Sequence, residues 1–481
     1  MSFGFDVSKE DRRNVLALLM VGLALKLYAF SQMYLISDDG AFQYLPVAKL
    51  FYEGKYLQAL TQPQLPLYPF LISALTRLMG NPELAGQVIS IVFSLFAVVP
   101  LYFLGRTLFG AKSAFWTGLL YLVNPVMLKT SVDVLKEGLV VFFVLSAVYC
   151  SVRFLVEGGG LWFIWAVILS ILGALTRITA LSVLFALCVW LGYQYVRGGP
   201  SDGKRAYPYH WAALFMAAVG LALIFPGLMG WDVMVTKKYY GVAREVISKW
   251  PSVLHLEQKL VYAAAQFVTV ACLVPFVVAL VAMGSRIRAR EFNAEEWYLV
   301  LLIILTVPSF LIRDSSRYLL PAVFLLYVWA GHGLVKAKEY IDKRYPGHSK
   351  LAAVVVVTVV LASILPMSLR PQRLGKVGRR EVGLWLKQQP VAAPVIVTNV
   401  PRVAYYAGGH HILVDAEVMS MDEIIQLARG NRADYLALEV DAEASAGERT
   451  STPFEGQNSV RLVLTHPYGR HGTTIYVYKL R

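Results

Sequence analysis

Long apolar runs are the feature that most constrains this chain. The first covers residues 14–36, and about 20 helical residues suffice to cross a hydrocarbon core of about 30 Å. The pattern predicts a polytopic α-helical membrane protein with about eleven transmembrane helices. The later runs lie at residues 84–104, 114–130, 134–152, 161–175, 179–195, 211–229, 261–283, 297–312, 318–335 and 351–369. The region 161–195 is compatible with one broken hairpin or with two helices.

Composition and charge support a membrane protein. Hydrophobic residues make up 57% of the chain and charged residues 16%, and the mean hydropathy is +0.55, outside the range of soluble domains. The net charge of +14 comes from basic residues in short loops between the runs, which is typical of membrane topology and argues against a nucleic-acid partner. The three cysteines lie inside apolar runs and indicate neither disulfides nor a metal cluster.

The distribution of lysine and arginine orients the chain. A cytoplasmic N-terminus places most basic residues in cytoplasmic loops, as the positive-inside rule expects. The first outer loop then covers residues 35–83, and the tail after residue 370 lies outside the membrane. Within this loop, residues 66–79 are apolar but too short to cross easily, so we expect an interfacial or re-entrant helix there. The basic cytoplasmic loops lie at residues 106–112, 153, 197–205, 286–290 and 336–350.

The tail has the composition of a soluble domain. We therefore expect two domains, a membrane domain at 1–370 and an extracytoplasmic domain at 371–481. Strands alternate with helices in the tail, which predicts a small α/β domain. One helix opens with Ser420 followed three residues later by Glu423, the signature of a capping box. The predicted strands cover 395–398, 412–414, 435–440, 460–465 and 473–478, and the predicted helices cover 379–388 and 419–428.

Two adjacent carboxylates, Asp38 and Asp39, follow directly on the first apolar run. One interpretation is structural: either side chain caps a helix that runs to Leu50 by accepting hydrogen bonds from free backbone N–H groups. The other is chemical, because a carboxylate near neutral pH can act as a general base and take a proton from a hydroxyl or an amine. Both interpretations can hold at once.

Several basic residues stand at the outer ends of the predicted spans. Arg177 interrupts two apolar runs, either as an interfacial anchor or as a phosphate ligand that uses its planar fork. Arg313 and Arg317 present the same choice, although Asp314 can pair with one of them. Each of the other candidates has a simpler reading beside a functional one. Lys136 and Glu137 neutralise each other or line a cavity, Lys237 and Lys238 face headgroups or cover a site, and His410-His411 form a polar turn rather than a metal site.

The order of these motifs resembles a known enzyme family. The acidic pair precedes Ala48-Lys49 and Glu53-Gly54, and then Pro63 opens a segment that ends in Pro66-Leu67-Tyr68-Pro69. This arrangement is similar to that of the GT-C membrane glycosyltransferases, in particular the members that depend on polyprenyl-phosphate sugars. Those members include protein O-mannosyltransferases, lipid A aminoarabinose transferases and their bacterial relatives. The segments 175–177 and 317–321 and the small extracytoplasmic α/β domain are also similar to theirs.

The resemblance implies an inverting transfer of a monosaccharide from a polyprenyl-phosphate carrier to an acceptor lipid, glycan or protein. It also implies a multi-pass protein of a bacterial cytoplasmic (inner) membrane, acting at its outer face. No metal is required by this chemistry, although a divalent metal ion is compatible with the acidic pair. The implied catalytic residues are Asp38, as the base, and Asp39; the donor phosphate ligands are Arg177, Arg313, Arg317, Lys237 and Lys238; the residues of the substrate cavity are Lys136, Glu137, Gln64, Tyr68 and Tyr318.

Two alternatives stay open. A GT-C oligosaccharyltransferase or polymerase would share the fold but use an oligosaccharide donor, and a metal-binding acid pair in a second outer loop would favour it. A lipid-linked sugar transporter would carry out no chemistry, and charges near the bilayer midplane with inverted repeats would favour it.

Overall fold

A computed structural model gives the fold of the chain in two compact units. One unit comprises Met1–Phe30 and Val47–Arg370, and the other comprises Ser31–Pro46 and Pro371–Arg481. The short segment after the first helix therefore groups with the tail rather than with the membrane part. The structure describes residues 7–196, 256–313, 315–346, 349–416, 418–440, 460–468 and 473–480. The predicted span at 211–229, with Lys237 and Lys238, lies outside these residues.

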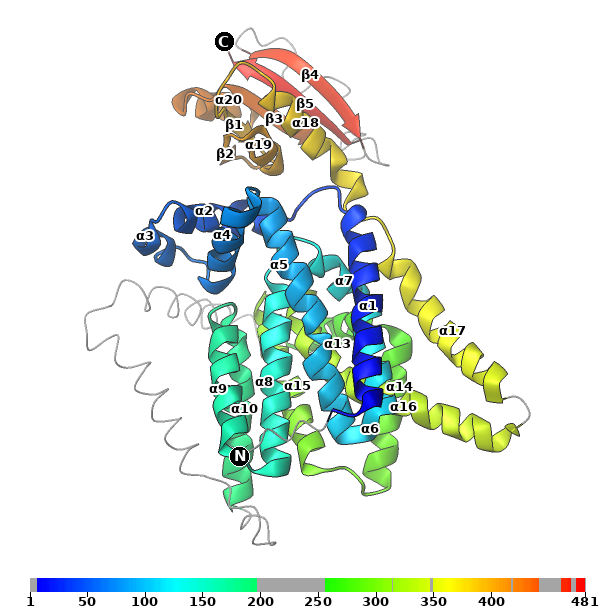
Figure 1. The fold of residues 1–481 in the computed structure, drawn as a ribbon. Helices are drawn as coiled ribbons and strands as arrows, with labels where there is room; N and C mark the ends of the chain where they lie inside the picture. Colours follow the sequence, from blue (N-terminus) through cyan, green and yellow to red (C-terminus); the bar gives the residue numbers. More distant parts are fainter. Residues whose placement is uncertain are drawn as a thin grey trace. The chain divides into compact units, whose positions relative to one another are not determined.

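The first unit is helical (Figure 1). Its core forms where α6 packs along α16, α8 along α9 and α14 along α16. Large side chains such as Trp329 and Tyr327 are fully buried among these helices. The helices are α1 (Lys9–Ser31), α2 (Leu45–Tyr52), α3 (Tyr56–Leu60), α4 (Leu67–Met79), α5 (Pro82–Phe96), α6 (Val98–Val123), α7 (Pro125–Ser131), α8 (Glu137–Glu157), α9 (Gly160–Ala174), α10 (Ser182–Val196), α13 (Leu256–Ala271), α14 (Leu273–Arg288), α15 (Ala294–Arg313), α16 (Leu320–Arg344) and α17 (Ser349–Ser368).

Four helical stretches in the described part are long and apolar enough to cross a membrane. A bent pair, Val261–Ala271 with Leu273–Arg288, makes a fifth if it counts as one span. Other apolar helices, α4, α9 and α10 among them, are shorter than a full crossing. The structure thus supports a helical protein with several membrane-crossing helices, whereas the predicted number of about eleven spans stays a prediction. The four stretches are Lys9–Ser31, Pro82–Val123, Glu137–Glu157 and Ser316–Arg344.

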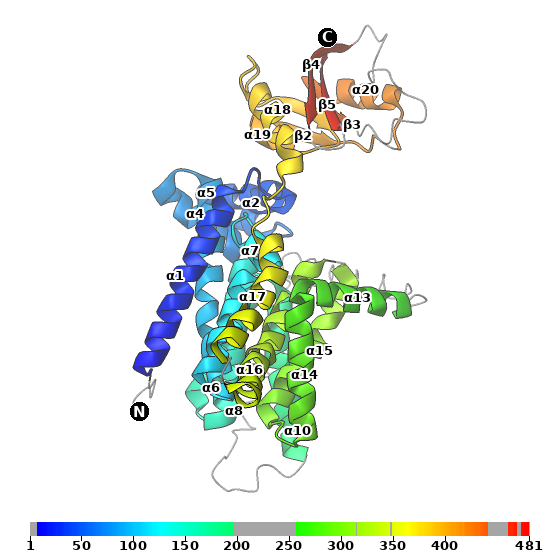
Figure 2. The same cartoon turned by 90° about the vertical axis from the view of Figure 1, so that its right-hand side faces the viewer.

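Two breaks separate helices in the first unit. Within the predicted span at 261–283 the helix is bent, because α13 and α14 meet at an angle of 103° at Cys272, whose φ is 61°. Figure 2 shows that α13 runs in a different direction from α14.

Inside α6, Gly110 has φ 84° and ψ 171°, a conformation that only glycine adopts without strain. The region 161–195 forms two helices, α9 and α10, joined by the 3₁₀ turn Ile178–Leu181.

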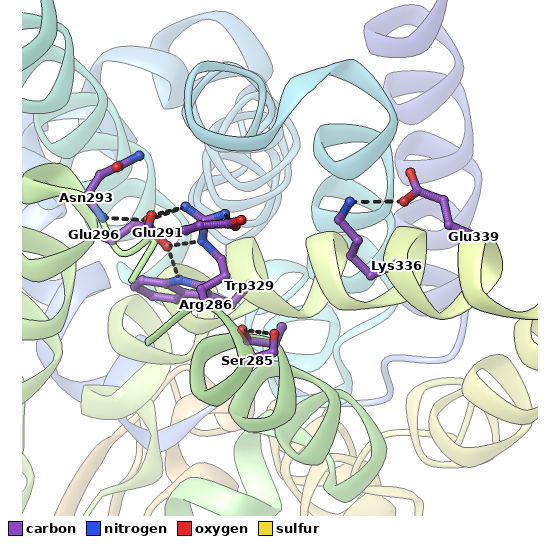
Figure 3. Close-up of polar contacts among 9 residues, drawn as sticks. Ser285, Arg286, Glu291, Asn293, Glu296, Trp329, Lys336 and Glu339 are labelled. Atoms are coloured by element: carbon purple, nitrogen blue, oxygen red, sulfur yellow. Dashed lines mark hydrogen bonds and ion pairs between the residues drawn. The ribbon is translucent and has the colours of Figure 1, made fainter. Parts of the chain in front are cut away.

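A buried carboxylate joins three of these helices (Figure 3). Glu296, in the first turn of α15, is fully buried. Arg286 of α14 donates to its two oxygens at 3.0 and 2.9 Å. Trp329 of α16 donates its indole N–H to Glu296 at 2.9 Å, and the backbone N–H of Asn293 adds a bond of 2.9 Å. Because these donors satisfy both oxygens, the network holds α14, α15 and α16 together without leaving a buried charge unpaired.

The second unit is built on a five-stranded sheet of order β2-β1-β3-β5-β4. β1, β2 and β3 are parallel, whereas β5 pairs antiparallel with β3 and with β4. The predicted small α/β fold of the tail is confirmed, and so is the capping box of Ser420 and Glu423. The elements are α18 (Val377–Lys387), β1 (Val395–Thr398), α19 (Arg402–Ala407), β2 (His410–Leu413), α20 (Met421–Gly430), β3 (Tyr435–Val440), β4 (Val460–Tyr468) and β5 (Thr473–Leu480).

The interpretation of His410-His411 as a polar turn is wrong. Both residues lie in β2, where His410 pairs with Val395 and His411 with Ile396 of β1. The turn comes earlier, at Gly408, whose φ of 69° ends α19 in the left-handed conformation that glycine favours.

Candidate functional site

The first unit contains a buried cluster at the start of α8. Glu137 is the first residue of this helix and is 1% exposed. The next residue, Gly138, lies against α5, and a Cβ there would approach the Ser90 carbonyl oxygen to 2.6 Å. A glycine is therefore required for this close contact of α5 with α8, and the contact buries the carboxylate beside it.

Two arginines from later parts of the chain pair with Glu137. Arg177 Nη2 lies 2.6 Å from Glu137 Oε1, and Arg317 Nη1 lies 3.5 Å from the same oxygen. Arg177 also places its guanidinium over the ring of Tyr318, 4.3 Å from the centroid, a cation–π contact. The structure thus gathers four residues that the sequence singled out separately: Glu137, Arg177, Arg317 and Tyr318.

Backbone geometry fixes Arg177 in this position. The residue lies between α9 and the 3₁₀ turn, with extended φ of −152° and ψ of 121°. Its N–H donates to the Gly173 carbonyl at 2.8 Å, which continues the end of α9. Just before it, the Leu175 carbonyl accepts a bond of 3.2 Å from the N–H of Leu67 at the start of α4. The start of α4 is therefore tied directly to the segment that carries Arg177.

The cluster combines basic and acidic groups, and the fully buried Asp133 lies four residues before Glu137. Arg177, Arg317 and Lys136 all act electrostatically on the single carboxylate of Glu137. Two buried polar atoms, Oε2 of Glu137 and Nε of Arg177, have no hydrogen-bond partner within the described part of the chain. A buried guanidinium with a spare donor fits an anion that presents several acceptor oxygens, such as a phosphate.

The other predicted cavity and phosphate residues have surroundings of their own or lie outside the described side chains. Tyr68 is fully buried, and its hydroxyl bonds to Gly86 and Ser90 of α5 at 3.2 and 2.9 Å, which joins α4 to α5. Gln64 is half-buried in the turn before α4. Arg313 ends α15, but the described residues do not include its side chain.

The second unit holds the acidic pair. The prediction that Asp38 caps a helix is wrong: its side chain makes no capping hydrogen bond, and Ser37 Oγ instead accepts the Gly40 N–H at 3.2 Å. Asp38 pairs with Arg402, whose Nε and Nη2 each lie 2.5 Å from one carboxylate oxygen. Asp39 accepts a bond of 3.0 Å from the Gln43 amide.

The backbone before Asp38 is bound to the tail domain at several points. Gln372 and Arg373 donate to the carbonyls of Gln32 and Leu35 at 3.1 and 2.9 Å. Arg380 donates to the Tyr34 carbonyl at 3.0 Å. The Ile36 N–H donates to the Tyr406 hydroxyl at 3.1 Å, and Phe42 packs edge-on against His411 with centroids 4.6 Å apart. We call residues 32–36 the strap, because these bonds hold them to the tail domain.

Arg402 is the functional candidate that the sequence reading missed. It opens α19, a short helix that was not predicted, one residue after Pro401 and just beyond the carboxyl end of β1. The carboxyl ends of parallel strands are common places for functional side chains in α/β domains. A proline followed by an arginine at that edge was the one available signal.

Metal ligands do not gather in the described residues. No group of three His, Cys, Asp or Glu side chains there is arranged to hold an ion. Both oxygens of Asp38 face an arginine, and this neighbour does not suit a cation site. A metal requirement is not established by these observations.

Comparison with known proteins gives one family match. Residues 61–230 match the model of the family described as dolichyl-phosphate-mannose-protein mannosyltransferase. The matched residues include Tyr68, Glu137 and Arg177. A search of curated proteins finds no match to the chain.

Solved structures share the fold at low sequence identity. The archaeal oligosaccharyltransferase AglB from Archaeoglobus fulgidus, in complex with an inhibitory peptide and a dolichol-phosphate, has a TM-score of 0.58 at 9% identity, over 90% of this chain and 70% of that chain. The Archaeoglobus fulgidus oligosaccharyltransferase in complex with Zn and sulfate has a TM-score of 0.57 at 11% identity, over 96% and 72%. ArnT from Cupriavidus metallidurans, bound to undecaprenyl phosphate, has a TM-score of 0.57 at 12% identity, over 96% and 97%. These likenesses confirm the GT-C fold that the sequence resembles.

Proposed function

We propose that this chain is an inverting glycosyltransferase that moves a monosaccharide from a polyprenyl-phosphate carrier to an acceptor at the outer face of a bacterial cytoplasmic membrane. The observation that carries the proposal is the buried cluster in which Arg177 and Arg317 converge on Glu137, while Nε of Arg177 has no hydrogen-bond partner among the described residues. Leaving a buried donor unsatisfied is costly, so an anionic ligand with acceptor oxygens stabilises such a cluster. The family match at 61–230 and two fold neighbours in complex with dolichol-phosphate or undecaprenyl phosphate support a lipid phosphate as that anion.

Each residue of the cluster has its own role in binding the donor phosphate. Arg177 and Arg317 bind the phosphate oxygens through guanidinium donors and stabilise the charge that grows on the phosphate as it departs. Lys136 adds positive charge, and Glu137 holds the two arginines in place between turnovers. Tyr318 limits the motion of Arg177 through its ring contact.

An apolar groove near the cluster suits the polyprenyl chain. It has a volume of about 370 Å³ and is lined by Phe93, Phe96, Phe103 and Phe142, among others. Phe142 follows Glu137 by five residues in α8, a rise of about 8 Å along the helix axis. The isoprenoid units of the lipid would lie in this groove, which Phe93, Phe103 and Phe142 line from α5, α6 and α8.

Asp38 acts as the base in this proposal. Its side chain is 55% exposed, so an acceptor can reach it. The acceptor hydroxyl or amine gives its proton to Asp38, and the acceptor atom forms a bond to the anomeric carbon from the face opposite the phosphate. The bond between that carbon and the phosphate oxygen breaks, and its electrons leave on the polyprenyl phosphate. Inversion follows from the single displacement, and no step involves a metal.

The finer assignments extend the same proposal. Residues 237 and 238 would cover the donor, and Arg313 would add to the phosphate ligands. The N-terminus would be cytoplasmic, the tail extracytoplasmic, and the acceptor a lipid, a glycan or a protein.

The experiment is a transfer assay with purified protein in nanodiscs. The donor is a polyprenyl-phosphate sugar labelled in the sugar, and the acceptors come from an envelope lipid and glycan extract. We expect label on one acceptor class, release of polyprenyl phosphate, and loss of both in Arg177→Ala. Translocation of an intact donor without release of polyprenyl phosphate would instead identify a transporter. Transfer that occurs only from an oligosaccharide donor would identify the oligosaccharyltransferase alternative.

A further inference from the structure

We infer that Arg402 of the tail domain is a positioning residue for Asp38. Through this residue the tail domain contributes to catalysis. The inference rests on the proposed role of Asp38 as the base. It starts from the forked contact, in which Nε and Nη2 of Arg402 each hold one oxygen of Asp38 at 2.5 Å.

A fork of this kind sets the plane of the carboxylate. Two parallel bonds prevent rotation about the last side-chain bond of Asp38, which a single bond would allow. Each carboxylate oxygen has a second lone pair, so both oxygens can still accept a proton from another direction. The exposed fractions of the two side chains agree with this arrangement: 6% for Arg402 and 55% for Asp38. The arginine holds the acid from the buried side and leaves the other side accessible.

Arg402 is itself held firmly. The next two residues, Val403 and Ala404, are fully buried in the tail core. A Cβ at Gly383 of α18 would lie 2.6 Å from the Val403 carbonyl oxygen, so α18 and α19 are in close contact. The third nitrogen of the guanidinium, Nη1, has no hydrogen-bond partner among the described residues. The orientation of this buried side chain is therefore coupled to Asp38 through the fork.

The surrounding charges favour a carboxylate in this position. Burial together with the charges of Arg379 and Arg402 lowers the pKa of Lys376, whereas Asp38 and Glu439 raise it. Asp38 and Glu439 thus offset the charges of three neighbouring basic groups. The strap adds backbone bonds beside it, so the tail domain controls both the backbone and the side chain of the proposed base.

Catalysis depends on this placement, because a base that is displaced by about 1 Å can lose on the order of 100-fold in rate. Arg402→Ala should therefore lower kcat by about 10- to 100-fold and leave the donor KM nearly unchanged. Arg402→Lys keeps the charge but lacks the fork, so its kcat should fall between those of the wild type and the alanine variant. Arg429→Ala is the matched control, because it removes an exposed arginine of α20 in the same domain that makes none of the bonds of the strap; its kcat should stay close to that of the wild type.

Chemical rescue separates positioning from folding. Guanidinium ions at low millimolar concentration should restore part of kcat in Arg402→Ala and should not activate Arg429→Ala or Asp38→Asn. Unchanged or raised kcat in Arg402→Ala would overturn the inference, and so would a loss that guanidinium does not restore while Arg402→Lys has wild-type kcat. If Asp38→Asn is fully active, the proposed base is wrong. If Asp38→Asn is inactive and Arg402→Ala is not, only the positioning role fails.

Discussion

Glu137 accepts a hydrogen bond of 2.6 Å from Arg177 in the interior of the first unit, although the two residues are 40 positions apart. The pair joins the first turn of α8 to the end of α9. Arg317, from the 3₁₀ turn just before α16, approaches the same oxygen. One carboxylate therefore holds two arginines in place. Replacing this carboxylate by a neutral side chain tests whether the cluster binds an anion.

Glu137→Gln should lower the Tm of the protein without ligand. It should also increase the rise in Tm that polyprenyl phosphate causes. Removing one partner of a buried ion pair leaves the other charge uncompensated and costs about 3–5 kcal/mol. Polyprenyl phosphate supplies the missing negative charge, so it should raise the Tm of the variant more than that of the wild type. Thermal unfolding in detergent, with and without polyprenyl phosphate, measures both effects.

Glu339→Gln provides the control for this prediction. Glu339 pairs with Lys336 at the surface (Figure 3), and such pairs contribute about 0–1 kcal/mol. Its Tm and its response to lipid should match those of the wild type. An equal lipid response in wild type and Glu137→Gln would contradict an anion site at the cluster.

Arg177→Lys should raise the donor KM or lower kcat by about 10-fold, since lysine keeps the charge but loses the planar fork. Arg317→Lys should cost less, because Arg317 is more exposed and farther from Glu137. Steady-state kinetics with the labelled donor measure the change. Arg153→Lys, in the last turns of α8, should leave the kinetics unaltered, and wild-type values in both cluster variants would remove the phosphate role.

Asp38→Asn should lower the transfer rate by about 10²- to 10⁴-fold, because an amide cannot accept the proton. Protein level and donor binding should change little. Asp39→Asn should cost less, because its carboxylate bonds locally to Gln43. Single-turnover rates of the two variants decide the order, and a larger loss in Asp39→Asn would exchange the two roles.

Lys26→Met should raise the Tm in detergent. Lys26 is 1% exposed in α1, and the described residues offer it no hydrogen bond or ion pair. A buried ammonium without a partner is costly, whereas methionine fills a similar volume without charge. A fall in Tm would show that Lys26 has a partner that the bare chain lacks, such as a lipid headgroup.

Local patterns in the sequence determined much of the architecture. The apolar runs predicted most of the described helices of the first unit, and short apolar runs predicted β1 and β3 with their observed bounds. The capping box at Ser420 was equally readable. These features depend on neighbours a few residues apart, because helices, strands and caps are stabilised by local hydrogen bonds and by one-sided burial.

Long-range packing decided the rest. The break at Cys272 leaves no mark in hydropathy, because both arms of the bend are apolar. Arg402 lies 364 positions after Asp38, and nothing in the residues around either one specifies the other. The sequence by itself therefore determined which residue types stand at the ends of the helices and after the strands. Only the tertiary structure decided which charges meet, since an ion pair between distant residues depends on how the intervening chain packs and on which of its groups become buried.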